Sequence, residues 1–258
     1  MKVITVINDK DDKYFNLLRL SCALNGLELV VLVSKEQDFY SMKLKDQLLL
    51  AYLDEINDDE LILFTDGTDA IFIADEVEIL EKFSKFDSDL VFSAETGCWP
   101  DKGLAKFYDC CENTPYIYLN SGGFIGRAGL IKELLSKTKE NDIESNTYSN
   151  QFVWANCYLK NKDRIKLDTF CEIFCTFYTD FGEEFVISDI DKCYTMKNQW
   201  IEENFQIENH RLYNKMTKSF PCQLHFNGNS KAFLDDKIYN LVYSAIPNYK
   251  SVQFYQEM

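Results

Sequence analysis

Residues 60–72 read ELILFTDGTDAIF, an apolar run that ends on two aspartates, Asp66 and Asp69. Residues 61–65 are apolar or uncharged without alternation, which is typical of a strand that is buried on both faces. Charge at the end of such a strand is costly unless a partner or a metal ion neutralises it. Gly67 permits a tight turn that aims both carboxylates at one point. The segment therefore indicates a polar site at the end of a buried strand.

The two aspartates supply hard oxygen ligands, which favour Mg²⁺ or Mn²⁺, and these ions usually share their coordination with substrate phosphates. Two other interpretations are open on the segment alone. One is a solvated turn in which Asp66 caps a helix or closes an Asx turn. The other is a phosphatase with an aspartyl nucleophile, although that class normally has one residue between its aspartates and this chain has two.

Strands and helices alternate through the first hundred residues around this segment. Apolar runs predict strands at residues 2–7, 28–33, 60–65 and 89–94. Apolar residues at helical spacing predict helices at residues 14–24, 44–55 and 77–86. This alternation is typical of βαβ units and predicts an α/β fold with a mixed, mostly parallel sheet flanked by helices. Ligands bind such a sheet at the carboxyl ends of its strands, near a topological switch point.

The pattern becomes looser after Ala94. We expect short strands at 116–119 and 124–125, helices at 130–139 and 151–159, mixed strands to about residue 226, and a closing helix at 236–245. No linker rich in Pro, Gly or Ser interrupts the chain, and it contains only four prolines. The sequence therefore predicts a single domain over residues 1–258.

The composition is that of an acidic globular protein. Of 258 residues, 46% are hydrophobic and 15% aromatic, which excludes a disordered chain. The net charge of −15 argues against nucleic acid as a partner. Nine cysteines without a Cys-x-x-Cys pair indicate free thiols in a reducing compartment. The first apolar run is too short for a signal peptide or a membrane span, so we expect a soluble protein in the cytoplasm of the producing or host cell, with no membrane partner.

His225 lies in a second polar segment, QLHFNGNSK at residues 223–231. A histidine that follows an apolar stretch is more often structural than a ligand. Here, however, Asn227, Gly228 and Lys231 add amide donors, a flexible backbone and one cation, which is what a diphosphate needs. An imidazole that joins two carboxylates favours Mn²⁺ over Mg²⁺, because nitrogen is the softer ligand.

Two further segments carry polar or aromatic side chains. Residues 120–126 read NSGGFIG, which lacks the glycine spacing of a dinucleotide fingerprint. A close backbone approach to a ligand beside Asn120 and Ser121 and a glycine-rich bend between strands both fit this segment. Glu95 directly follows the fourth predicted strand, and Trp99 lies four residues later. A carboxylate and an aromatic ring suit the hydroxyls and apolar faces of a sugar, although a tryptophan that anchors a loop fits equally well.

Four segments, in this order, resemble the glycosyltransferase domain of the multifunctional procollagen lysyl hydroxylases. They read ILFTDGTDAIF, DLVFSAETGCWPDKGLA, YLNSGGFIGRA and LHFNGNSK, and the match runs from about Val3 to Tyr239. The resemblance implies a GT-A-like, Rossmann-like fold with a nucleotide-binding part at about 1–100 and an acceptor-side part at about 100–258. It also implies a UDP-sugar as co-substrate and Mn²⁺ as cofactor, with Mg²⁺ as the alternative.

The resemblance assigns roles to residues that match its motifs. The implied metal ligands are Asp66, Asp69 and His225. The implied donor-binding residues are Lys43, Thr68, Asn227, Gly228 and Lys231. The implied sugar and acceptor residues are Trp99, Asn120, Ser121 and Gln151. Glu95 and Asn150 are expected to act in catalysis together with the two aspartates.

Two positions depart from the family's pattern. Thr68 stands where the family has a tyrosine stacked on uracil, and Ser149-Asn150 stands where it has an acidic pair. The loss of the tyrosine predicts weaker donor affinity or base selectivity. The loss of the acidic pair argues against any role at Asn150 that needs a carboxylate.

We expect a free-standing transferase, because the chain has no His-x-Asp pair for the non-haem iron site of the hydroxylase half. The expected reaction is glucosyl transfer from UDP-glucose to galactosyl-hydroxylysine of collagen or a collagen-like protein, with retention. The departing phosphate can serve as base on that route, which fits an amide at Asn150. The alternatives are inverting galactosyl transfer from UDP-galactose to hydroxylysine, with Glu95 as base, and a non-catalytic sugar-nucleotide-binding module.

Overall fold

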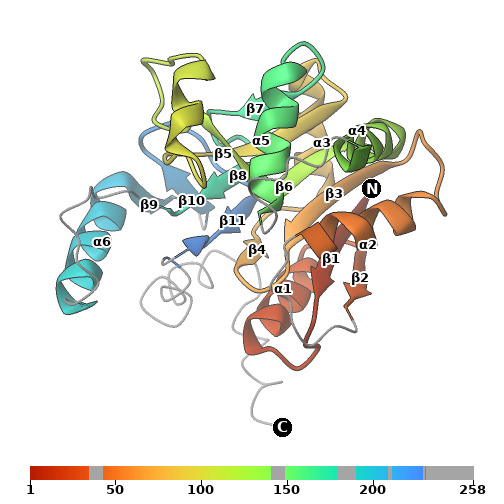
Figure 1. Cartoon of the computed structure of the whole chain (residues 1–258). Helices are drawn as coiled ribbons and strands as arrows, with labels where there is room; N and C mark the ends of the chain where they lie inside the picture. The colour runs from red at the N-terminus through yellow and green to blue at the C-terminus, as the bar shows by residue number, and fades with distance from the viewer. Residues whose placement is uncertain (35–42, 141–148, 179–189, 209–210, 229, 231–258) are drawn as a thin grey trace, which may run out of the picture.

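A computed structural model of the chain describes residues 1–34, 43–140, 149–178, 190–208, 211–228 and 230 (Figure 1). Its main element is a six-stranded sheet in the order β2-β1-β3-β6-β5-β7. The strands are β1 (Lys2–Ile7), β2 (Leu29–Val33), β3 (Leu61–Asp66), β5 (Leu90–Glu95), β6 (Tyr118–Arg127) and β7 (Lys166–Asp168). Within this sheet only β6 runs antiparallel to its neighbours, so the predicted mostly parallel sheet is confirmed.

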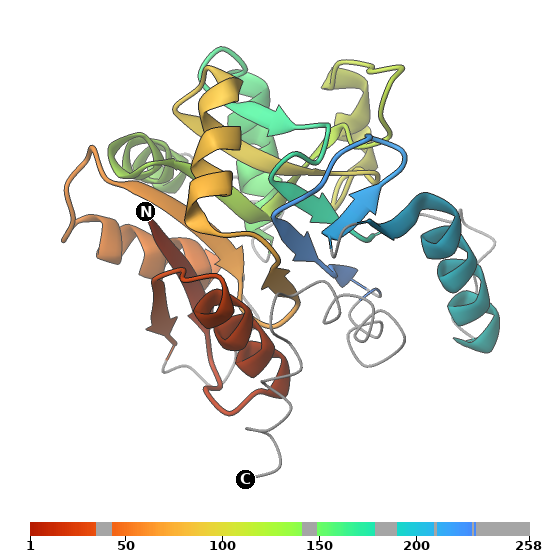
Figure 2. The same cartoon turned by 180° about the vertical axis from the view of Figure 1, so that it is seen from behind.

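Helices cover both faces of this sheet (Figures 1 and 2). One face carries α1 (Lys13–Leu24) and α3 (Glu76–Phe83, extended by a 3-10 turn, Ser84–Phe86), and the other carries α2 (Lys43–Leu53), α4 (Ala128–Glu140) and α5 (Asn150–Lys160). The alternation of side chains along each strand creates two apolar cores. Val3 and Leu63 pack toward α1 and α3, whereas Ile4 and Ile62 pack toward α2, α4 and α5.

Local chemistry sets the ends of the first helix. Asp12 caps α1 by accepting hydrogen bonds from the backbone amides of Tyr14, at 2.8 Å, and Phe15, at 3.0 Å. Gly26 follows the helix with φ +66°, the left-handed conformation that glycine adopts most easily. The chain then enters β2 at the edge of the sheet.

Two smaller sheets complete the fold. One has the order β4-β11-β8 and consists of β4 (Ala70–Phe72), β8 (Phe174–Thr176) and β11 (Gln223–His225). The other pairs β9 (Phe205–Glu208) with β10 (Arg211–Asn214). A 3-10 helix, Lys102–Phe107, follows β5. The antiparallel pairing of β11 with β4 places His225 opposite Ala70, directly after the two aspartates of the turn.

The second half of the chain differs from the prediction in two places. Residues 118–127 form one strand instead of two short ones around a bend. The glycines stay in the strand because larger side chains need the space beside them: a Cβ at Gly123 would lie 2.6 Å from Gln223 Oε1. A helix, α6 (Ile190–Asn204), occupies part of the region expected to hold only strands. The helix predicted at 236–245 lies outside the described residues.

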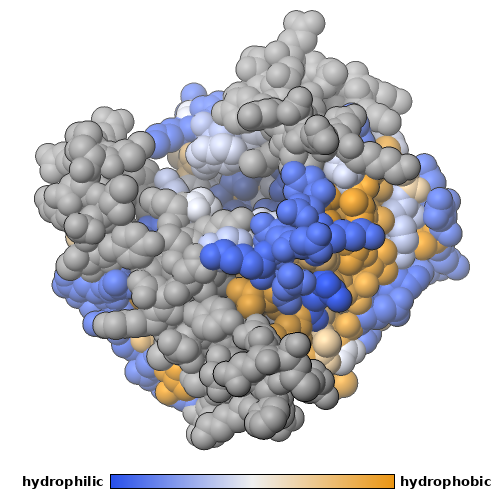
Figure 3. Space-filling view, turned by 90° about the horizontal axis from the view of Figure 1, so that it is seen from below, coloured by the Kyte–Doolittle hydropathy of each residue, from blue (hydrophilic) through white to orange (hydrophobic). Residues whose placement is uncertain are grey.

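The face of the molecule seen from below exposes both hydrophilic and hydrophobic residues. Figure 3 shows hydrophilic residues in the middle of the face seen from below, and hydrophobic residues beside them on the side where β1 and β2 lie in Figure 1. All five residues of the edge strand β2 are half-buried. Among the helices of the described residues, none has the length and apolar character needed to cross a bilayer. The eight described cysteines are free thiols.

An aromatic cluster under the central strands should carry much of the stability. The ring of Phe124 lies 4.9 Å from Phe64, 4.7 Å from Phe92 and 5.6 Å from Trp154, centroid to centroid. Phe124→Ala should lower the free energy of unfolding by about 3–5 kcal/mol, measured by urea denaturation. The matched control is Phe107→Ala, because that ring is 54% exposed. A similar loss in both variants would contradict this description of the core.

Candidate metal and substrate site

The candidate site lies where several strands end on polar residues. Asp66 ends β3, Glu95 ends β5 and His225 ends β11. The parallel strands β3 and β5 end at the same edge of the main sheet. β4 follows β3 after a short turn, and its pairing with β11 places His225 at that edge as well. These ends line a cavity of about 230 Å³. Its walls contain Asp66, Asp69, Glu95, Trp99, Asn120, Ser121, Asn150, Gln151, His225, Asn227 and Gly228, all of which the sequence predicts for the site.

Three of these side chains converge on one point. One ligand atom each from Asp66, Asp69 and His225 lies within 4.8 Å of the others. His225 Nε2 is 3.6 Å from Asp66 Oδ2 and 3.4 Å from Asp69 Oδ1. Burial lowers the pKa of His225, but the carboxylates of Asp69 and Asp66 outweigh it and raise that pKa overall. The field at this point therefore favours positive charge.

The histidine is oriented as a metal ligand would be. Its Nδ1 lies 3.1 Å from Asn120 Oδ1, so Nδ1 carries the hydrogen that this amide oxygen accepts. In the neutral form, which is the form that binds a metal, the lone pair of Nε2 faces the two aspartates. Among the described residues, Nε2 is one of few buried side-chain nitrogen or oxygen atoms without a hydrogen-bond partner. Two carboxylates and a neutral imidazole held by a neighbouring side chain fit a divalent cation.

Gly122 makes room for this imidazole. A Cβ at Gly122 would lie 2.1 Å from His225 Cε1 and 2.9 Å from Asp66 Oδ2. The glycines of the NSGG segment therefore serve neither a bend between strands nor a dinucleotide fingerprint. Gly122 lets β6 pass directly under the histidine.

Lys45, in the first turn of α2, is a site residue that the sequence analysis missed. Its ammonium lies 2.6 Å from Asp66 Oδ1, and its side chain is almost completely buried and lines the cavity. Burial lowers the pKa of Lys45, but Asp66, Asp69 and Asp46 together raise it, so the group stays charged. The same segment contains two lysines, and the family resemblance implies Lys43 as the donor-binding one. The side chain of Lys43 lies outside the described residues.

Glu95 is held by amides from two sides of the cavity. Gln151 Nε2 donates to Oε1, and Asn227 Nδ2 donates to Oε2 at 2.8 Å. The carboxyl group is only 2% exposed, and this burial raises its pKa to about 7 against the opposing effect of the hydrogen bonds. Glu95 is therefore close to half-ionised at neutral pH.

Tyr178 completes the wall near the second polar segment. Its backbone amide donates to Asn227 Oδ1 at 3.1 Å, and its ring lies against Gly228, where an added Cβ would be 3.3 Å from Tyr178 Cδ2. Nothing in its local sequence, FCTFYTDF, distinguishes this tyrosine from the aromatic residues around it. Only the tertiary fold assigns it to the cavity.

Besides Lys43, two predicted residues are not among those that line the cavity. Thr68 is half-buried in the turn between the aspartates but is not among the residues that line the cavity. Lys231 lies outside the described residues.

Asp46, which the sequence analysis did not select, accepts hydrogen bonds from the cavity residue Asn150 and from Trp154, at 3.3 and 3.2 Å.

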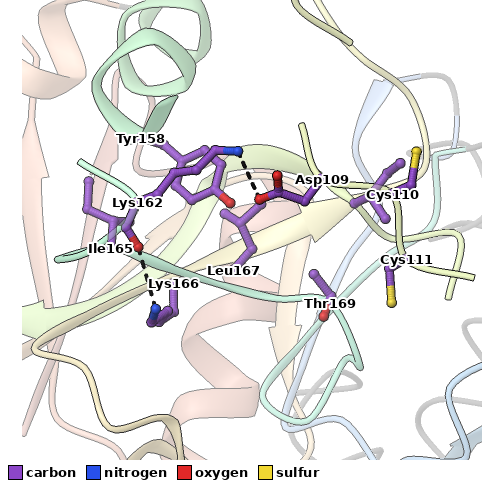
Figure 4. A pocket seen from close by; sticks show the side chains of 10 residues that line it. Asp109, Cys110, Cys111, Tyr158, Lys162, Ile165, Lys166, Leu167 and Thr169 are labelled. Atoms are coloured by element: carbon purple, nitrogen blue, oxygen red, sulfur yellow. Dashed lines mark hydrogen bonds and ion pairs between the residues drawn. The ribbon is translucent and has the colours of Figure 1, made fainter. Parts of the chain in front are cut away.

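A second cavity, of about 290 Å³, lies between the end of α5, β7 and the segment at 109–117 (Figure 4). Its charged groups are partnered locally: Lys162 Nζ lies 2.8 Å from Asp109 Oδ2, and Lys166 Nζ lies 3.5 Å from the Lys162 carbonyl. The thiols of Cys110 and Cys111 point in different directions. Within the described part of the chain, only the Asp66–Asp69–His225 group brings three ligand atoms close enough for one ion.

The spacing around Gly122 yields the first prediction for the site. Gly122→Ala should weaken Mn²⁺ binding by about tenfold or more, because the new methyl group displaces the His225 ring. Titration calorimetry with Mn²⁺ measures this. Gly26→Ala is the control, since that glycine also has a constrained role, with φ +66°, but lies away from the site. Equal Mn²⁺ affinity in both variants would refute the placement of His225.

The burial of Glu95 yields a second prediction. Its pKa is about 7 in the folded protein and near 4.5 when unfolded, so the charged form costs folding free energy as pH rises through this window. Glu95→Gln removes this cost. Its effect on the free energy of unfolding should be more favourable at pH 8 than at pH 5, by up to about 3 kcal/mol. Urea denaturation at the two pH values measures it, and a pH-independent effect would contradict the burial of a titrating carboxyl group.

Comparison with known proteins assigns the chain to a family. The chain matches the PLOD GT domain family over residues 1–248. An uncharacterised protein of Acanthamoeba polyphaga mimivirus is 31% identical over 193 residues, which cover 74% of this chain and 36% of that protein. The procollagen-lysine,2-oxoglutarate 5-dioxygenase of Drosophila melanogaster is 32% identical over 177 residues, covering 65% of this chain and 23% of that enzyme. The human multifunctional procollagen lysine hydroxylase and glycosyltransferase LH3 is 36% identical over 117 residues, which cover 45% of this chain and 16% of that enzyme.

The chain therefore spans only part of these relatives: the matched residues make up 36%, 23% and 16% of their lengths.

Solved structures show the same fold. The bifunctional glycosyltransferase WbbM superposes with a TM-score of 0.54 at 13% identity, covering 96% of this chain and 50% of that one. The galactosyltransferase LgtC superposes with a TM-score of 0.52 at 12% identity, covering 95% of each chain. These superpositions confirm the predicted GT-A-like fold, and the match over residues 1–248 shows that the chain belongs to the PLOD GT domain family.

Proposed function

We propose that this protein transfers glucose from UDP-glucose to galactosyl-hydroxylysine of collagen or a collagen-like protein, with retention at the anomeric carbon. The observation that carries the proposal is the convergence of Asp66, Asp69 and His225 at the carboxyl edge of a GT-A-like sheet. Membership of the PLOD GT domain family supports the sugar-nucleotide donor and the collagen-like acceptor. The relative LH3 is named for both lysine hydroxylation and glycosyl transfer.

Asp66, Asp69 and His225 would hold the divalent cation, and the imidazole favours Mn²⁺ over Mg²⁺. When bound, the ion supplies Lewis-acid stabilisation of the negative charge that develops on a leaving diphosphate. Lys45 brings a second positive charge to the same edge of the cavity, because its ammonium lies beside Asp66. A cation so placed stabilises a phosphate oxygen as the bond to the sugar breaks.

The sugar and its acceptor would occupy the other end of the cavity. Trp99 lines the cavity and is 41% exposed, so its ring offers an apolar face to a sugar entering from solvent. Asn120 orients His225, while the backbone amide of Ser121 donates to Gln151 Oε1. These residues bind and orient a substrate and do not themselves transfer protons.

The environment of Glu95 favours retention over inversion. An inverting transfer needs a side-chain base that accepts a proton from the acceptor hydroxyl. Both carboxylate oxygens of Glu95 already accept amide hydrogen bonds, from Gln151 and Asn227, and the group is almost completely buried. Glu95 is thus better suited to hold these two amides. On the retaining route the departing phosphate takes the proton from the acceptor hydroxyl.

Release of UDP tests the proposal. We expect the protein to hydrolyse UDP-glucose slowly without acceptor, with stimulation by Mn²⁺, and faster with a collagen peptide that carries galactosyl-hydroxylysine. Asp66→Ala should lower turnover by about a hundredfold or more, because the cation loses a ligand. Asp163→Ala, which removes an exposed aspartate, is the control.

The remaining arms of the experiment separate the alternatives. Faster turnover with UDP-galactose on unglycosylated hydroxylysine peptide would favour the galactosyltransferase, and NMR of the product would show inversion. Binding of UDP without release from any UDP-sugar, with or without Mn²⁺, would favour a non-catalytic sugar-nucleotide-binding module. Full activity of Asp66→Ala with unchanged metal dependence would overturn the assignment of the site.

A further inference from the structure

Asp46 is a half-buried carboxylate beside the cavity that the proposed reaction does not use. It lies in the first turn of α2, and its Oδ1 accepts hydrogen bonds from Asn150 Nδ2, at 3.3 Å, and Trp154 Nε1, at 3.2 Å. Both donors belong to α5, which lies on the same face of the sheet as α2 (Figure 1). Asn150 is 1% exposed and lines the cavity. A charged group from one helix thus holds a cavity residue of another.

A continuous set of hydrogen bonds leads from Asp46 to Glu95. Ser121 Oγ donates to Asn150 Oδ1 at 3.4 Å, and the backbone amide of Ser121 donates to Gln151 Oε1 at 3.3 Å. Gln151 Nε2 in turn donates to Glu95 Oε1. Two neighbouring amide side chains at the start of α5 therefore lie between two carboxylates, with Ser121 of β6 between them.

The carboxylates fix which way each amide points. An ionised carboxylate only accepts hydrogen bonds, so it must face the NH₂ end of an amide. Asp46 therefore turns the oxygen of Asn150 toward Ser121, and the ionised form of Glu95 turns the oxygen of Gln151 toward Ser121. Without a carboxylate at position 46, nothing in this set of contacts would prevent the Asn150 amide from reversing.

We infer that Asp46 is a positioning residue of the substrate cavity, which fixes the Asn150 amide and, through it, the Ser121 hydroxyl. The inference rests on the proposed function, because the orientation of these groups matters to turnover only if the cavity binds a sugar nucleotide. The neighbouring Lys45 lies beside Asp66. The first turn of α2 therefore fixes both the metal-ligand end and the amide end of the cavity.

The experiment measures kcat and KM for UDP-sugar hydrolysis, Mn²⁺ affinity and the melting temperature in each variant. Asp46→Asn should lower kcat/KM by about tenfold or more, as expected for misplaced substrate-positioning groups. Its Mn²⁺ affinity should stay within about threefold of the parent, because no metal ligand changes. Trp154→Phe is the matched control: it removes the other donor to Asp46 and core volume, so the melting temperature falls while kcat/KM stays within about threefold.

An exchange of the two groups provides the decisive arm. Asn150 Nδ2 now lies 3.3 Å from Asp46 Oδ1. Asn150→Asp alone replaces this hydrogen bond by two carboxylates that repel each other, and should therefore also lower kcat/KM. In the double variant Asp46→Asn with Asn150→Asp, the amide at position 46 accepts from Trp154 and donates to the carboxylate at position 150. That carboxylate still accepts from Ser121. The double variant should therefore exceed each single variant in kcat/KM by about fivefold or more.

Each result has a defined meaning. A double variant no better than the worse single variant, or an Asp46→Asn variant as active as the parent, would overturn the inference while leaving the proposed function intact. Variants that melt below the assay temperature both singly and together would assign Asp46 to folding alone and would also overturn it. A parent protein that neither hydrolyses UDP-sugars nor binds UDP would instead overturn the proposed function, and this inference with it.

Discussion

Two half-buried carboxylates and one buried imidazole whose ligand atoms lie within 4.8 Å of each other impose the main constraint on this structure. Like charges so close together repel, and they persist in a folded protein only when positive charge compensates them. Lys45 beside Asp66 and the raised pKa of His225 are both responses to that field. A divalent cation would satisfy it more completely, because it binds all three ligands at once.

The architecture around the site follows from this constraint. The parallel strands bring Asp66 and Glu95 to one edge of the main sheet, and the pairing of β11 with β4 carries His225 to the same edge from the far end of the described chain. β6 passes beneath them with Gly122 in place of a larger side chain. The apolar cores on both faces of the sheet keep these strand ends in place, so the precision of the site depends on packing far from it.

The sequence allows the βαβ part and the metal-ligand candidates to be predicted, because both depend on local patterns. Long apolar runs mark the buried strands. Asp66 ends one of them, and Asp69 lies in the turn that follows it. The strand β4 has only three residues, too few for a periodic signal, and the continuous strand β6 depends on what packs against its glycines. Lys45, Asp46 and Tyr178 were missed for a related reason. An acidic residue in the first turn of a helix normally indicates a solvated helix start, and only the contact with Asn150 gives Asp46 another role.

The central claim is that Asp66, Asp69 and His225 bind one cation beneath the diphosphate of a nucleotide. Pulsed electron paramagnetic resonance of the Mn²⁺ complex with UDP tests it directly. The protein is labelled with ¹⁵N-histidine and carries His210→Gln, which leaves His225 as the remaining histidine of two. The account predicts one Mn²⁺ per chain, coupled both to a histidine nitrogen and to the phosphorus nuclei of UDP. Bound Mn²⁺ that couples to phosphorus but to no histidine nitrogen would contradict it.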